Sequence, residues 1–433
     1  MRQRQRVKAM NAHKLAWRSG AIVLALALIL AAWVAWLNVR GEASLKEGVS
    51  ATSASPELIA RGAYLARAGN CMGCHTAAGG AAFAGGRGVE TPFGLVVAPN
   101  ITPDAKTGIG DWSADEFWRS LHHGRSKDGR LLYPAFPYPS FTQVSREDSD
   151  ALYAFLRSVP AVEKSNQAHA LRFPYSTQAA LAIWRALYFR PGAFEPDAGQ
   201  SADWNRGKYL TLGLGHCAAC HSGRDALGGT RLNAEFAGGL MPDATWYAPS
   251  LASPDEAGVQ RWPREEVVRL LKDGVSAHAS VSGPMAEVVF NSTQYLTERD
   301  VDAMARYLMS IPVNERPPAM PRGATVEALG AGSKVFEQHC AACHGERGQG
   351  VPGMYPALAG NRAVALASHI NVVQAIRQGG FMPTTAGNRQ PFGMPPFGQA
   401  LNNDEIAAVA TYIRQSWGNA AAPVSTLDVL RVK

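Results

Sequence analysis

The six cysteines of the chain all lie in one short pattern, Cys-x-x-Cys-His, which occurs three times. The copies read CMGCH, CAACH and CAACH. Their reactive residues are Cys71, Cys74 and His75; Cys217, Cys220 and His221; and Cys340, Cys343 and His344. Two thiols one helical turn apart can bond to the two vinyl groups on one edge of a porphyrin, and the next residue places an imidazole under the iron. The pattern therefore predicts three covalently bound haem c groups.

Cysteines at this spacing have other uses. One copy alone fits a redox-active pair or half of a zinc site, and six cysteines in an oxidising compartment can form three disulfides. Three copies that use every cysteine, each followed at once by histidine, favour haem over these alternatives.

A haem iron held by histidine has a sixth position, where methionine or histidine sets the redox potential and the access of other ligands. The first two copies keep equal spacing from Ala98 to Gly124 and from Ala248 to Gly274. Eleven residues after Gly274 lies Met285, and the third copy has Met394 in the loop before its last helix. Met285 and Met394 are therefore predicted ligands of the second and third haems, although methionine also fills gaps in a core.

The first copy has no such methionine, because Phe136 stands at the ligand position. The first haem is predicted to be five-coordinate, to bind water, or to take another side chain. His122 and His123 are the nearest candidates, and His169 is more remote. An equally good interpretation is that His122 and His123 are two polar residues at a helix end with no role at the iron. The sixth position therefore stays open between His122, His123 and a vacant site.

Each motif lies between two predicted helices. The helix before it carries Gly62, Gly207 or Gly332, which we expect to let the first and last helices cross closely. The helix after it begins with a capping pair: Ser145 and Asp148, Thr297 and Asp300, or Asn402 and Glu405. This layout is typical of small helical cytochromes c. The sequence predicts an all-α fold of three tandem class I cytochrome c domains at 56–165, 201–316 and 325–420, with a linker at 166–200.

The net charge of +7 comes entirely from residues 1–40, and the rest of the chain is balanced. A nucleic-acid partner is therefore not expected. Residues 21–37 carry no charge and would form a helix of about 26 Å, enough to span a bilayer. The basic residues before this stretch predict a transmembrane anchor within 1–40, with the haem domains facing the periplasm from the inner membrane. A cleaved signal peptide, with a weak site at Gly41-Glu42-Ala43, is the alternative.

The chain resembles the tri-haem cytochrome c subunit of bacterial membrane-bound dehydrogenases for alcohol, gluconate, fructose and aldehyde, and the cytochromes of nicotinate and isoquinoline dehydrogenases. Residues 91–117, 201–221, 282–297 and 394–419 carry the resemblance. It implies a catalytic partner subunit with flavin, quinone or molybdenum cofactor, and ubiquinone or a terminal oxidase as acceptor. The sugar and alcohol members usually have methionine at the place of Phe136, and this difference favours a molybdenum-hydroxylase or aldehyde-oxidising partner.

The sequence holds no dinucleotide fingerprint, P-loop or nucleophile elbow. We expect the chain to relay electrons and not to act on the organic substrate by itself. The alternative is a peroxidase or gas sensor that uses an open first haem. The aromatic linker at 173–194 is predicted to be either a docking or membrane-touching element or a packed interdomain helix.

Overall fold

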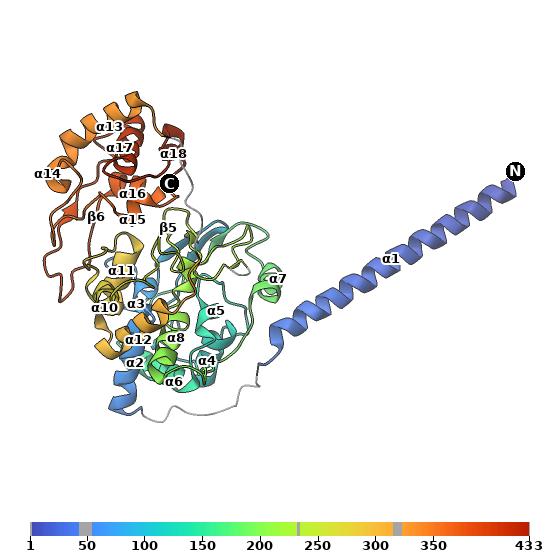
Figure 1. The fold of residues 1–433 in the computed structure, drawn as a ribbon. Helices are drawn as coiled ribbons and strands as arrows, with labels where there is room; N and C mark the ends of the chain where they lie inside the picture. Colours follow the sequence, from blue (N-terminus) through green and yellow to red (C-terminus); the bar gives the residue numbers. More distant parts are fainter. Residues whose placement is uncertain (1, 43–53, 232–233, 315–322, 433) are drawn as a thin grey trace.

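The computed structural model describes residues 2–42, 54–231, 234–314 and 323–432, with side chains from residue 14 onward. A long helix, α1 (Arg2–Val39), projects from a body built of three consecutive segments (Figure 1). Each segment contains one Cys-x-x-Cys-His motif. The predicted domain end at 316 lies outside the described residues.

The first segment runs from α2 to α7. Its helices are α2 (Pro56–Ala68), α3 (Cys71–His75), α4 (Ala114–His123), α5 (Tyr138–Phe141), α6 (Arg146–Ser158) and α7 (Gln178–Tyr188). Its strands β1 (Gly88–Thr91), β2 (Gly94–Val97) and β3 (Ala170–Leu171) form one antiparallel sheet in the order β1-β2-β3.

The second segment contains α8 (Ala202–Leu212), α9 (Ala218–His221), β4 (Gly239–Leu240), β5 (Tyr247–Ala248), α10 (Arg264–Asp273), α11 (Pro284–Asn291), the 3₁₀-helix η1 (Thr293–Tyr295) and α12 (Glu298–Met309). The third contains α13 (Val326–His339), α14 (Ala341–His344), α15 (Arg362–Ala365), α16 (Ile370–Gln378), β6 (Gly380–Phe381), β7 (Gly393–Met394), α17 (Asn403–Gln415) and α18 (Thr426–Arg431).

The all-α prediction needs a correction. The described residues are mostly helical, but they also contain short antiparallel pairs: β1 with β2, β4 with β5, and β6 with β7. In the first pair Thr91 faces Gly94 across a two-residue turn, and Gly94 has a φ of 125°, which an L side chain rarely adopts. A β-branched run on both sides of a Pro-Phe-Gly turn favours this hairpin.

The predicted helix crossings are confirmed. A Cβ atom added to Gly62 would overlap the carbonyl oxygen of Ala151 in α6, and one on Gly207 would overlap that of Ala303 in α12. The same close approach joins Gly332 of α13 to α17. The predicted caps are also present, since the side chains of Ser145, Thr297 and Asn402 each accept a hydrogen bond from the backbone N–H three residues on.

The first and second segments share one hydrophobic core, which includes Leu65 and Leu152 from the first and Leu210 and Val301 from the second. A reciprocal pair of hydrogen bonds ties them together. Tyr64 of α2 donates to Asp300 at 2.6 Å, and Tyr209 of α8 donates to Asp148 at 2.6 Å. Each aspartate also accepts from the arginine of its own segment, Arg206 for Asp300 and Arg61 for Asp148. The two segments therefore form one unit.

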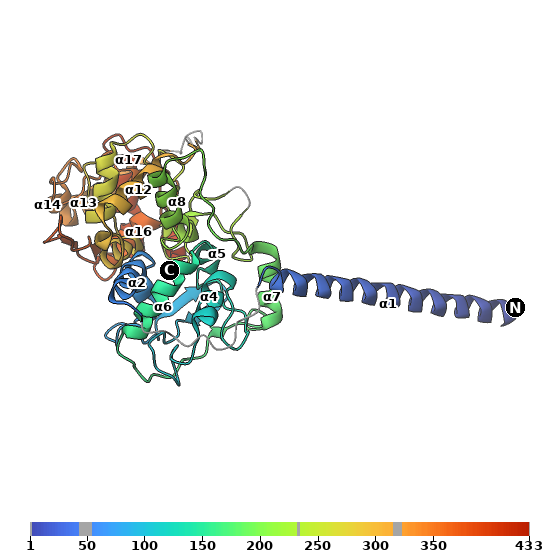
Figure 2. The ribbon, with the colours of Figure 1, turned by 90° about the horizontal axis from the view of Figure 1, so that it is seen from below.

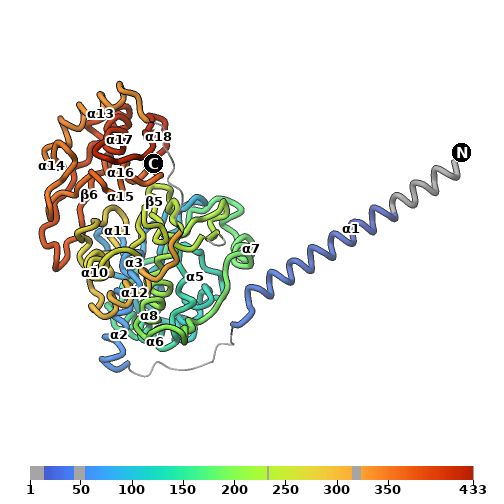
Figure 3. The backbone as a smooth tube through the Cα atoms, viewed as in Figure 1, coloured from blue at the N-terminus to red at the C-terminus, as the bar shows by residue number. Residues whose placement is uncertain are grey.

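The third segment has a separate core around Phe336, Val373 and Ile406. It lies on the second segment through polar contacts: Asn371 exchanges two hydrogen bonds with the backbone of Tyr247, at 2.8 and 2.9 Å. The tube in Figure 3 shows this part as the orange and red portion above the intertwined blue, green and yellow segments. At the equivalent of Tyr64 and Tyr209, two residues after the crossing glycine, the third copy has Lys334, which has no hydroxyl group for such a reciprocal bond.

Within α1, Lys14–Val39 is long and apolar enough to cross a membrane, with a mean hydropathy of 2.5 and none of its most apolar window buried. Its carboxyl end contacts α7, where the Asn38 amide donates to the carbonyl oxygen of Ala182 at 2.9 Å. Figure 2 shows α7 lying crosswise to α1, at the edge of the body from which α1 leaves.

Candidate haem sites

The three motif histidines share one arrangement. The Nδ1 atoms of His75, His221 and His344 lie 2.8, 2.7 and 3.0 Å from the backbone oxygens of Pro99, Pro249 and Pro356. Because a carbonyl oxygen only accepts, Nδ1 carries the hydrogen and Nε2 keeps a free lone pair. Burial lowers the pKa of all three imidazoles, so the neutral, metal-binding form is favoured. A histidine oriented by such a bond is suited to hold a metal on its other nitrogen.

None of the six cysteines, all of which lie among the described residues, is joined to another in a disulfide. Burial raises the pKa of Cys71 and of Cys217 to about 12, and that of Cys340 to about 11. A reactive redox pair needs a lowered thiol pKa, so these environments do not favour the redox alternative. The short helices α3, α9 and α14 hold the motif residues, and this donor set fits a haem that is bound through two sulfurs and one imidazole.

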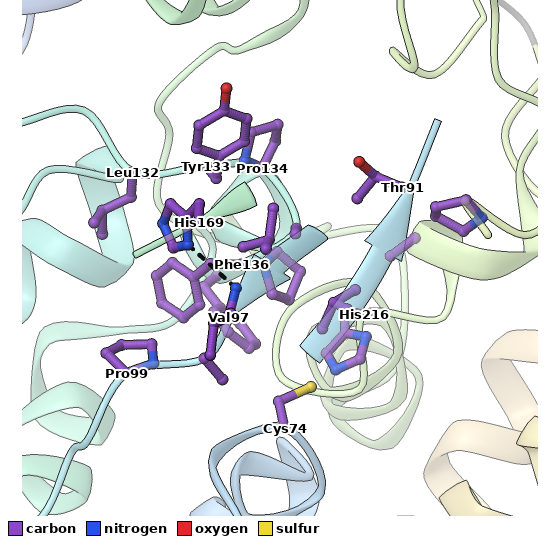
Figure 4. A pocket seen from close by; sticks show the side chains of 18 of the residues that line it. Cys74, Thr91, Val97, Pro99, Leu132, Tyr133, Pro134, Phe136, His169 and His216 are labelled. Carbon is purple, nitrogen blue, oxygen red and sulfur yellow. Dashed lines mark hydrogen bonds between the residues drawn. The ribbon is translucent and has the colours of Figure 1, made fainter. Parts of the chain in front are cut away.

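A cavity of about 2090 Å³ lies beside the first motif and is lined by Cys71, Cys74 and His75. It extends to Cys220 of the second motif, and its walls are largely apolar side chains. Figure 4 shows Cys74 at one end of this space, with Val97, Pro99 and Phe136 around it. The size, apolar walls and attachment residues of the cavity fit a haem.

Phe136 lines this cavity, and its place at the sixth position of the iron stays a prediction. Its ring meets Phe141 edge to face, with the centroids 5.3 Å apart. Phe141 in turn contacts His216, which precedes Cys217 and also lines the cavity. The sequence reasoning did not single out His216, although its place next to the second motif was a usable signal.

The structure does not bring His122 or His123 to the cavity lining. His122 stacks on Trp118 at 4.5 Å between ring centroids. His123 is buried, and this burial, together with nearby His122 and arginine charges, lowers its pKa to about 4. The more remote candidate, His169, does line the cavity near Phe136 (Figure 4). Its Nδ1 accepts from the N–H of Val97 at 3.1 Å, so in the neutral ring the hydrogen sits on Nε2.

The two methionines lie in different local structures. Met285 is in the first turn of α11 and packs against the shared core that Cys217 also contacts. Met394 is in β7, paired with Gly380, and packs against the third core together with Cys340. The core beside Met285 also contacts Cys71 of the first motif, so the role of Met285 and Met394 as iron ligands stays a prediction.

Arg87 connects the first motif to α11. Its guanidinium donates to the carbonyl oxygen of Gly73, inside the first motif, at 2.5 Å. It also forms an ion pair with Glu287, two residues after Met285. The helix that carries the predicted ligand of the second haem is therefore fixed against the attachment site of the first.

The attachment residues, the oriented histidines and the crossing helices define a c-type cytochrome. The family model for cytochrome c matches residues 59–160 and 329–417, which include the first and third motifs. The cytochrome c subunit of the alcohol dehydrogenase (quinone) of Gluconacetobacter polyoxogenes is 38% identical over 403 residues, covering 88% of this chain and 85% of that protein. The gluconate 2-dehydrogenase cytochrome c subunit of Pantoea cypripedii is 37% identical, covering 88% of this chain and 90% of that protein.

A third relative, the fructose dehydrogenase cytochrome subunit of Gluconobacter japonicus, is 33% identical over 432 residues, covering 92% of this chain and 87% of that protein. The chain belongs to the family of cytochrome c subunits of dehydrogenase complexes. The resemblance inferred from the motifs is thereby confirmed.

Proposed function

We propose that this chain carries electrons out of a dehydrogenase complex through three covalently bound haem c groups. A catalytic subunit with flavin, quinone or molybdenum cofactor would oxidise the organic substrate. This chain would then pass single electrons to membrane ubiquinone or to a terminal oxidase. The observation that carries the proposal is the cavity lined by Cys71, Cys74 and Cys220, because it brings attachment residues of two haems against one space.

Each bound haem supplies one-electron redox chemistry. The protein holds it by the two cysteines of a motif and by the Nε2 atom of His75, His221 or His344, whose rings the proline carbonyls orient. Met285 and Met394 would fill the sixth position in the second and third sites. In the first site we propose an open sixth position, since Phe136 cannot bind iron and His122 and His123 do not line the cavity. His169 does line it, but its Nδ1 accepts from the N–H of Val97, so its Nε2 carries the hydrogen in the neutral ring and has no free lone pair.

We further propose that α1 anchors the chain in the inner membrane, with the three segments as haem domains in the periplasm. The length and hydropathy of α1 support the anchor. The basic residues before the apolar stretch support this orientation.

The number of haems tests the assignment directly. Denatured full-length protein should keep three covalently bound haems, measured as pyridine haemochrome per chain. The double change Cys217→Ala and Cys220→Ala should leave two. Haem that is extracted by acidified acetone, or an unchanged haem content in the double variant, would refute the attachment sites.

The ligand-reactive alternative depends on the sixth position of the first haem. Carbon monoxide added to the reduced protein should bind at most one haem of three. Haems with six ligands should not respond to carbon monoxide, so a response from all three haems would favour the ligand-reactive alternative over the relay.

A further inference from the structure

The helix α7 has two unlike faces. Leu181 and Arg185 are buried against the body, with 4% and 3% of their surface exposed. On the opposite face Ile183 and Leu187 are 54% and 55% exposed, and Ala179 continues the same stripe at four-residue spacing. Just before the helix, Phe173 is 83% exposed. Among the described residues of the body, this apolar stripe has no protein covering it.

The stripe lies where α1 joins the body. The Arg185 guanidinium donates to the Asn38 side chain at 2.8 Å, and the Asn38 amide donates to the backbone of α7. Arg125 donates to the backbone oxygen of Asn38 at 3.0 Å and pairs with Glu42. These bonds fix the end of the apolar helix against the inner face of α7, and Figure 2 shows α7 at the edge of the body from which α1 leaves.

The segment of sequence that contains α7 carries charge of one sign. Residues 164–194 contain Lys164, Arg172, Arg185 and Arg190 and no acidic residue. Arg172 and Arg190, on either side of the helix, are exposed. An apolar stripe with exposed arginines at both ends is typical of a helix that lies in the interface of a bilayer. The apolar side chains enter the lipid, and the arginines bind the phosphates of the headgroups.

We propose that α7 lies on the lipid bilayer, with Ile183, Leu187 and Phe173 among the headgroups and upper acyl chains, and acts as a second membrane contact beside α1. This inference rests on the proposed anchoring by α1. It assigns both faces of the aromatic linker: the inner face packs on the body and the outer face meets lipid. It also sets the orientation of the body, because one attachment point allows rotation and two contacts do not.

The placement has a consequence for the first haem site. Ile183, Trp184 and Leu187 line the same cavity as Cys74 and His75. Ile183 and Leu187 therefore lie at the border between the proposed lipid contact and the first haem site, so part of their exposed surface would face the haem and the rest would face lipid.

Photolabelling tests the proposal on the full-length haem protein. The chain is reconstituted in vesicles of phosphatidylethanolamine and phosphatidylglycerol that contain a phospholipid with a diazirine in its acyl chain, and labelled peptides are mapped by mass spectrometry. We expect label on α1 and on the α7 stripe, several-fold above the label on Phe290 of α11. Phe290 is a suitable control because it is 48% exposed and belongs to α11, which lies on the side of the body away from α1 (Figure 1).

A variant pair sharpens the result. Ile183→Gln with Leu187→Gln should reduce labelling of α7 several-fold while α1 stays labelled, and Phe290→Gln should change neither; haem content reports that each variant folds. Label on α1 with none on α7 would overturn the inference and leave the anchor in place. An unlabelled α1 and α7 would overturn both. Equal label on α7 and Phe290 would show non-specific exposure and would also overturn the inference.

Discussion

Two glycines of one helix allow the packing of the third segment to be tested with a matched pair of variants. Gly330 and Gly332 both lie within α13. A Cβ added to Gly330 meets no atom within 4 Å, whereas one added to Gly332 would overlap the carbonyl oxygen of Ala408 and lie 2.6 Å from the Cβ atom of Tyr412. Both obstacles are backbone or next to backbone, so α17 must move to admit the methyl group.

The two changes should act in opposite directions. Glycine to alanine inside a helix stabilises it by about 0.5–1 kcal/mol, and Gly330→Ala should show this gain in full. Gly332→Ala gains the same amount but overpacks the crossing, which costs about 1–3 kcal/mol, more if α17 cannot shift. Because both obstacles are backbone or next to backbone, the upper part of this cost applies, about 2–3 kcal/mol, and after a gain of about 1 kcal/mol the net loss is about 1–2 kcal/mol. At about 4–8 °C per kcal/mol for a unit of this size, the transition should fall by roughly 5–15 °C.

Differential scanning calorimetry of the oxidised full-length protein measures both shifts. The transition that Gly330→Ala raises should be the one that Gly332→Ala lowers, because both glycines belong to the third core. A Gly332→Ala protein as stable as the parent, or equal shifts from both variants, would show that α13 and α17 do not approach at this point.

Three other outcomes are expected. Phe136→Met should give the first haem a low-spin His/Met spectrum with a weak far-red sulfur-to-iron band and raise its potential; an unchanged spectrum would mean that Phe136 is not at the iron. Asp148→Asn removes a buried, charge-assisted hydrogen-bond partner of Tyr209, and calorimetry should show the first two segments destabilised together by about 1.5–3 kcal/mol. The control Asp203→Asn removes one partner of an exposed ion pair and should cost no more than about 1 kcal/mol in the same scans. Edman sequencing of membrane-extracted protein should find the basic amino-terminal residues intact, and a start near Ser44 would show a cleaved signal.

The local features of this fold could be predicted from the sequence because each depends on neighbouring residues. The Cys-x-x-Cys-His pattern fixes its own short helix, and Thr297 caps α12 through an N–H three residues away. The role of Gly207 at a close helix crossing could be predicted because a glycine recurs at the same position in all three copies. The β1–β2 hairpin was not predicted, because the repeated helical motifs favoured an all-helical fold.

The long-range features could not be predicted from one chain. Tyr64 reaches Asp300 across 236 residues, and no local preference indicates such a contact. A signal was nevertheless present: Tyr64 and Tyr209 hold equivalent places after the crossing glycine, and Lys334 replaces them in the third copy. His122 and His123 were chosen by nearness in sequence, but they do not line the cavity, whereas His169 and His216, which are more distant from Phe136 in the sequence, do.

The reciprocal tyrosine bonds also bear on how the chain matures. If the residues after α1 are exported in chain order, as proposed, α2 and α6 would lie outside the membrane before any residue of the second segment has crossed. Tyr64 then has no partner until Asp300 emerges, and the carboxylate of Asp148 has no tyrosine until Tyr209 emerges. Under the proposed export, the first segment would remain open to proteases and to the haem-attachment machinery through that interval. The third segment has a core of its own, so it would become resistant to proteases independently of the first two segments.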